Sequence, residues 1–183
     1  MGVVNTSGVV SVPPVLHPGM RTSGTVYYFA ATVLPSSTTG TVSANAFYCS
    51  PIYLMGTVTR IGIEVTTGSA GACRLGLFTN NNGVPGSLIL DAGTVDTTNI
   101  AIVEATISPI VLRNEWIWMG AVFDATPTVR TGGPSMAFMG GAGSTTASTR
   151  ALTGSFTYGA FPATAPTVGS QSSVGPAIFL RSA

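Results

Sequence analysis

The sequence predicts an all-β protein, an antiparallel two-sheet β-sandwich of jelly-roll-like form with an extended N-terminal arm. Three observations lead to this prediction. Between residues 59 and 124, apolar and polar side chains alternate with a period of two, which is typical of strands with one buried face. Turn-forming Gly, Pro, Asn, Ser and Thr separate these stretches. With 45% hydrophobic and 7% charged residues, the chain has the composition of a folded protein.

The chain divides into an arm, residues 1–21, and a single sandwich domain, residues 22–183. The arm is rich in Val and is broken by Pro13, Pro14 and Pro18, so it cannot form a helix. It has no positively charged beginning, and we do not expect a signal peptide.

The first strands of the domain are expected at residues 26–30 and 45–49, with a Ser- and Thr-rich surface loop at 35–41 between them. Residues 60–78 alternate on both sides of a small-residue turn at 68–71, which predicts a β-hairpin. The side chains expected to point inward in this hairpin are Ile61, Ile63, Val65, Cys73, Leu75 and Leu77.

Residues 80–87, NNNGVPGS, combine Asn, Gly and Pro, and we interpret them as a surface loop. Three strands follow, at 88–95, 100–108 and 116–123. The last is apolar on both faces, which predicts a central strand covered on both sides.

The C-terminal part is expected to add short strands at 135–139, 154–158 and 177–181. Long loops separate them, among them the Gly-, Ser- and Thr-rich residues 143–149.

Charge and hydropathy exclude two classes of partner. A formal net charge of +1, with seven Arg, no Lys and no basic cluster, argues against binding to nucleic acid. No uninterrupted apolar run reaches the length of a spanning helix, and the aromatic content of 8% is low for the girdles of a membrane barrel. We therefore expect no membrane insertion.

Candidate catalytic residues are scarce, and we expect neither an enzyme nor a cofactor. The one histidine, His17, lies between Leu16 and Pro18 with no neighbour to orient it. The acidic residues are scattered along the chain with no spacing suited to a metal site, although Asp91, Asp96 and Asn99 could share a cation. The six acids are Glu64, Asp91, Asp96, Glu104, Glu115 and Asp124.

The two cysteines, Cys49 and Cys73, can form a disulfide only if their strands are neighbours, which the sequence does not decide. Cys73 belongs to the inward set of its expected hairpin. Two buried thiols in a protein made in a reducing cytoplasm is the interpretation we favour.

The strand motif RIGIEVT, the turn GVPGS at 83–87 and the strand motif DAGTV, followed by EWIWMGAVFDATPTVR, resemble a β-sandwich module of tailed-bacteriophage virion surface proteins, especially tail fibres. The resemblance covers residues 26–130. Its motifs are signatures of a fold and carry no catalytic residues. The chain is short and lacks the internal repeats of fibre shafts.

The resemblance implies a structural virion protein made in the cytoplasm of a bacterial host. We expect a tail fibre or fibre-tip subunit that is a homo-oligomer, a trimer, and contacts a host surface glycan or protein. The alternative is a capsid decoration or cement protein that stabilises the head. A carbohydrate-active enzyme is a third possibility, which the lack of a suitable acid pair disfavours.

Sparse charge supports a permanent assembly, because charge keeps soluble proteins apart. For attachment to other virion proteins, of the baseplate, tail or capsid, we expect the apolar side chains of the arm to pack onto a partner: Val9, Val10, Val12, Val15 and Leu16. For glycan contact, the aromatic residues expected in loops are Tyr158 and Phe161, which could equally be packing residues under those loops. Trp116 and Trp118 share one strand face, and we assign them to the core or to an interface between subunits.

Overall fold

The protein is all-β and antiparallel in its computed structural model, which describes residues 3–4, 10–11, 27–29, 35–132 and 151–182. No helix occurs in these residues. The strands are β1 (Val3–Val4), β2 (Val10–Ser11), β3 (Tyr28–Phe29), β4 (Pro35–Thr41), β5 (Ala46–Thr67), β6 (Ala72–Asn81), β7 (Val84–Asp96), β8 (Ala101–Phe123), β9 (Thr128–Gly132), β10 (Ala151–Ser155), β11 (Ser170–Ser172) and β12 (Phe179–Arg181).

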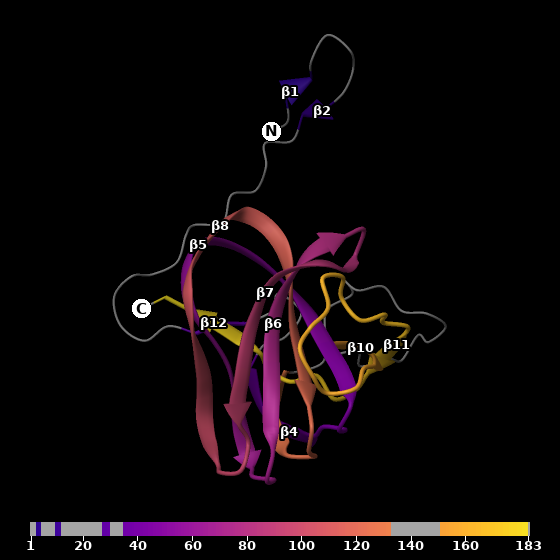
Figure 1. The fold of residues 1–183 in the computed structure, drawn as a ribbon. Helices are drawn as coiled ribbons and strands as arrows, with labels where there is room; N and C mark the ends of the chain where they lie inside the picture. The colour runs from indigo at the N-terminus through magenta and orange to yellow at the C-terminus, as the bar shows by residue number, and fades with distance from the viewer. Residues whose placement is uncertain (1–2, 5–9, 12–26, 30–34, 133–150, 183) are drawn as a thin grey trace.

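Two long strands, β5 of 22 residues and β8 of 23 residues, form an antiparallel ribbon that organises the rest. They pair from Phe47 opposite Val122 to Val65 opposite Ala101. The register shifts twice near the middle of β5, between Leu54 and Met55 and between Val58 and Arg60. Because such bulges bend a strand, the ribbon arches over at the top of Figure 1 and descends on the other side.

The bent ribbon gives the sheet two layers. The first half of β5 and the second half of β8 belong to a layer with the strand order β11-β10-β5-β8-β6-β7. The other halves of β5 and β8 form the second layer, in which β12 and β9 pair with the far edge of β5. β3 extends this layer by pairing with β12, and β4 extends it by pairing with β9.

The main hydrophobic core lies between these layers. It joins Tyr48 and Leu54 from the first half of β5 to Ile61 and Ile63 from the second half, and all four are buried. In each neighbouring strand, alternate side chains point into this core, as the period of two requires. The prediction of an antiparallel β-sandwich is thereby confirmed.

A second apolar cluster covers the outer face of the first layer. Phe47, Phe78 and Trp118 point into it, while Ile117 and Met119 on the same stretch of β8 point into the main core. The second half of β8 is thus buried on both faces, which confirms the central strand predicted at 116–123. The C-terminal residues 156–168 supply the cover, with Phe161 at the centre.

The hairpin predicted at residues 60–78 is wrong. β5 and β6 do not pair with each other, because residues 60–65 pair with the first half of β8 in the second layer, whereas β6 pairs with the second half of β8 in the first layer. Alternation identified the buried face of each strand correctly, but it contains no information on which strands become neighbours. The predicted strands 100–108 and 116–123 are likewise parts of the single strand β8.

The loop predicted at residues 80–87 is much shorter in the structure. β6 continues to Asn81 and β7 begins at Val84, so only Asn82 and Gly83 make the turn. Their φ angles are 50° and 87°, as a type I′ hairpin requires. Pro85 lies within β7 at an irregular part of the register, where a missing N–H donor is tolerated.

Five further predictions change or lie partly or wholly outside the described residues. The loop predicted at 35–41 is β4, and the strand predicted at 154–158 begins earlier and ends at Ser155. Of the N-terminal arm, only β1 and β2 are described, and they pair with each other. The predicted strand 135–139 and loop 143–149 lie outside the described residues.

Gly120 on β8 should be indispensable to the outer cluster, because a Cβ there would stand 2.6 Å from the Phe47 ring and 2.7 Å from the Phe78 ring. We predict that Gly120→Ala lowers the free energy of unfolding by about 1–3 kcal/mol through overpacking. Urea denaturation measures this change. Gly169→Ala is the matched control, because nothing lies within 4 Å of its added Cβ, and it should not destabilise the protein.

Candidate functional site

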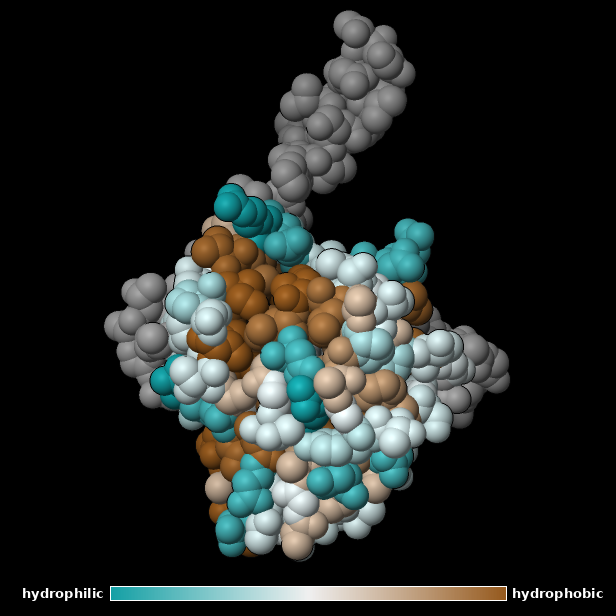
Figure 2. Space-filling model, viewed as in Figure 1, coloured by the Kyte–Doolittle hydropathy of each residue, from teal (hydrophilic) through white to brown (hydrophobic). Residues whose placement is uncertain are grey.

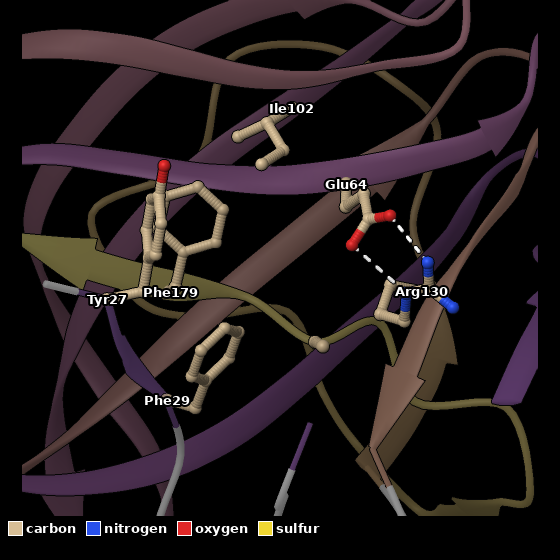
Figure 3. Close-up of a pocket in the computed structure, with 7 residues that line it drawn as sticks. Tyr27, Phe29, Glu64, Ile102, Arg130 and Phe179 are labelled. Carbon is tan, nitrogen blue, oxygen red and sulfur yellow. Dashed lines mark hydrogen bonds and ion pairs between the residues drawn. The ribbon is translucent and has the colours of Figure 1, made fainter. Parts of the chain in front are cut away.

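A cavity of about 190 Å³ opens on the outer face of the second layer. The inward residues of β5 here are Ile61, Ile63 and Val65, so Gly62 and Glu64 face outward. Several strands contribute one or two side chains each, as Figure 3 shows. The cavity is lined by Tyr27, Phe29, Glu64, Ile102, Arg130, Ala177 and Phe179.

Three aromatic rings form one end of this cavity. Phe179 packs edge-to-face with Tyr27, at 4.7 Å between ring centroids, and with Phe29, at 5.8 Å. The Phe179 ring lies over Gly62, where an added Cβ would come within 2.6 Å of Cζ. Glycine at position 62 therefore makes room for the edge of the Phe179 ring close to the sheet.

An ion pair forms the other end. Arg130 donates from Nε to Glu64 Oε2 at 3.0 Å and from Nη2 to Oε1 at 2.6 Å, a bidentate arrangement drawn in Figure 3. These hydrogen bonds lower the pKa of Glu64, against a smaller opposing effect of burial. Both side chains keep about a third of their surface exposed, at 27% for Arg130 and 35% for Glu64. The cavity thus combines apolar walls with a neutralised, accessible pair of charges.

A second bidentate pair lies beside the cavity on the same face. Arg181 Nε and Nη2 donate to the two carboxylate oxygens of Glu104 at 2.6 and 2.7 Å. Glu104 stands opposite Gly62 across the β5–β8 ladder, two residues from Ile102. Neither partner of this second pair lines the cavity.

All six acidic side chains accept hydrogen bonds within the fold. Three of them pair with Arg: Glu64, Glu104 and Asp91. The other three accept from backbone N–H groups: Asp96 from Thr98, Glu115 from Arg113, and Asp124 from Ala72. Asp91 and Asp96 thus have separate partners, and the described part of the chain holds no group of three potential metal ligands.

The two proposed glycan-contact residues lie in and beside the outer cluster. Phe161 is only 6% exposed, and its ring contacts those of Phe47, Phe78 and Phe156. It packs against Gly76, where a Cβ would approach it within 2.8 Å, and therefore presents no open ring face to a ligand. Tyr158 is half-buried against the same cluster, and burial raises its pKa.

The two tryptophans differ in exposure although they lie on one strand. Trp118 is buried in the outer cluster and donates from Nε1 to Asn80 Oδ1 at 3.0 Å, as expected for a core residue. Trp116 is more than a third exposed and packs against Tyr53.

Large apolar side chains reach the surface at several points of the long strands. Figure 2 shows apolar surface gathered in the upper half of one face, where Figure 1 places the arch of β8. Within the part of the chain that the structure describes, the exposed large apolar residues are Met55, Val84, Ile89, Ile100, Ile102, Val111 and Trp116. Ile102 belongs to this set and to the cavity wall.

The proposed attachment residues lie outside what the structure describes at the level of side chains. Val9, Val12, Val15 and Leu16 fall outside the described residues, as does His17, and Val10 is described only as part of β2.

The cavity is the feature that the sequence did not reveal. Its main side chains come from positions 29, 64, 102, 130 and 179, and no local pattern links them. The single available signal was the outward position of Glu64 in an otherwise apolar strand. Pairing of β12 and β9 with β5 brings these residues together.

Comparison with known proteins identifies no relative: no family model, no curated protein and no solved structure matches the chain. None of the described residues forms a helix long and apolar enough to cross a membrane.

The cysteines are both free and buried, Cys49 in the outer cluster and Cys73 in the main core. Burial raises the pKa of each thiol, so little thiolate exists at neutral pH. We predict that neither reacts with a thiol-specific disulfide reagent in the native protein and that both react after denaturation. The absorbance of the thiol released from the reagent measures the extent of labelling. Rapid labelling of the folded protein would contradict this prediction.

Asp91 holds the C-terminal cover to the sheet. It accepts from Arg74 Nε at 2.8 Å and from the backbone N–H groups of Gly93 and Phe161, each at 3.1 Å. Burial raises its pKa, but these hydrogen bonds outweigh burial, and the net pKa is below the ordinary value.

We predict that Asp91→Asn lowers the free energy of unfolding at pH 7 by about 1–3 kcal/mol, because charge-assisted bonds to Arg74 and Phe161 weaken. A lowered folded-state pKa stabilises above the unfolded pKa of about 3.9, and this stabilisation is lost as pH falls through the folded value. The difference from the parent should therefore shrink below about pH 4. Urea denaturation at several pH values measures it, and Asp96→Asn, on an exposed carboxylate of the same strand, should have the smaller effect.

Proposed function

We propose that this chain is a structural, non-catalytic subunit of a tailed-bacteriophage virion, of tail-fibre or fibre-tip type. It is a homo-oligomer, for which we expect three copies, and it attaches through its N-terminal arm and contacts the host surface. The observation that carries the proposal is a surface with little charge, three of its six carboxylates paired with Arg, and with large apolar side chains exposed on the long strands.

Such a surface favours association of the protein over the monomeric state. Large apolar patches on soluble proteins usually mark interaction sites, and permanent interfaces are more apolar than the remaining surface. Val111, at 58% exposure, and Met55, at 36%, lie where the β5–β8 ribbon bends, and this surface, the apolar arch, provides such a site. Long-range charge repulsion between copies is weak, because the formal net charge is +1.

The hydrogen bonds and ion pairs of the acidic side chains within the fold support a structural role. General acid–base catalysis needs a titratable group that can reach a substrate and exchange a proton. Here the carboxylates of Glu64, Asp91 and Glu104 are held by Arg, and the remaining three cap backbone N–H groups. Hydrogen bonds lower the pKa of Glu64, Asp91 and Asp96, which favours the ionised form of these three carboxylates.

Attachment through the arm is tested by deletion of residues 1–19. We predict that the truncated protein keeps its β-sandwich circular dichroism spectrum but no longer associates with particles, because the apolar arm residues are the attachment surface. Immunogold labelling of purified particles measures association and location. Loading of the truncated protein at the level of the full chain would refute the arm assignment, and label on the head would favour the decoration alternative.

A further inference from the structure

We propose that the cavity on the outer face of the second layer binds one neutral pyranose sugar, such as the terminal unit of a glycan. The inference deepens the proposed function, on which its biological setting rests, by giving host contact a ligand class and a site. That site differs from the residues expected from the sequence, since Phe161 is buried and Tyr158 lies against the other layer.

The size of the cavity suits one ring. Its volume of about 190 Å³ is below the roughly 300–1,000 Å³ of sites for drug-sized ligands. Phe29, Phe179 and Ile102 enclose this space from three different strands, as seen in Figure 3. A single hexose ring can enter, whereas the rest of an oligosaccharide has to stay outside.

The lining matches the two surfaces of a sugar. A pyranose has apolar C–H groups on the faces of its ring and hydroxyl groups around its edge. Tyr27, Phe29 and Ile102 offer apolar contact, and Ile102 is accessible at 53% exposure. Glu64 and Arg130 offer hydrogen bonding at the opposite end, 35% and 27% exposed.

The ion pair selects a neutral ligand. Because Arg130 already neutralises Glu64 through two hydrogen bonds, the site has no excess charge to attract an anion or a cation. Each carboxylate oxygen can accept more than one hydrogen bond, so sugar hydroxyls can donate to Glu64 while its bonds to Arg130 persist. Hydroxyl donors can thus replace the water that solvates the pair.

An apolar side chain from a protein partner fits the same space less well. It would cover the exposed ion pair and remove its water without supplying hydrogen bonds, and desolvation of charged groups is costly. Exposed apolar residues elsewhere, such as Val111 and Met55, have no comparable ion pair built into their surroundings in the described part of the chain. The apolar arch therefore suits protein contact, and the cavity suits a sugar.

The test is saturation-transfer NMR of the full-length protein with neutral monosaccharides: glucose, galactose, mannose, N-acetylglucosamine and rhamnose. We expect at least one to bind with a dissociation constant in the millimolar range, as befits a small single-ring ligand. Ile102→Trp should abolish binding by filling the cavity from an exposed position. Glu64→Gln should weaken binding about tenfold, since a hydrogen bond to a charged acceptor is lost.

Two matched variants control for the fold. Val111→Trp introduces the same side chain at an exposed position of β8 outside the cavity, and Glu104→Gln breaks the neighbouring ion pair. Both should bind sugar as the parent does, and thermal melting of all four variants verifies that they are folded.

Failure to bind any sugar of the panel overturns the proposal, as does undiminished binding by Ile102→Trp. Binding of N-acetyl-leucinamide in place of sugars overturns it too, in favour of a protein partner. All of these measurements use the isolated protein, so they are independent of the particle labelling. A sugar site in a protein absent from virions would refute the proposed function and leave this site standing.

Discussion

The bend of the β5–β8 ribbon is the constraint on which the rest of the structure depends. Strands of this length cannot stay flat in a small domain, and the two register shifts let the ribbon fold back on itself. Its halves then face each other across one core, so the same two strands supply both layers. The bend leaves Gly62 and Glu64 on an outer face where β12 and β9 can bring Phe179 and Arg130 beside them.

Neutralisation of charge across neighbouring strands is the second organising feature. Each of the three Arg–carboxylate pairs joins residues from different strands, so pairing of the strands and pairing of the charges occur together. Isolated surface ion pairs contribute little to stability. In a chain with 7% charged residues, however, they remove much of the charge that keeps protein surfaces apart, which is consistent with a protein that works in an assembly.

Sequence patterns predicted which faces of the strands are buried, but not which strands are neighbours. Ile61, Ile63, Cys73 and Leu75 are in the core as expected, whereas the placement of their strands in opposite layers, each paired with a different half of β8, depends on contacts far apart in sequence. Phe161 illustrates the same limit: between Ala160 and Pro162 it resembles a loop aromatic, yet Gly76 leaves space for its ring on the sheet. The cavity combines five distant segments, and the outward position of Glu64 was its single signal in the sequence.

A site on strands has different consequences from one on loops. Strand-borne side chains are held by the ladders beneath them, so little conformational entropy is lost when a ligand binds. A cavity that accepts one sugar ring is nevertheless limited to weak binding, because few atoms make contact. Repetition of the site in a homo-oligomer compensates, since linked weak sites bind a multivalent surface by far more than one site alone. In the homo-oligomer that we propose, contacts through the apolar arch would bring several copies of the proposed sugar site together.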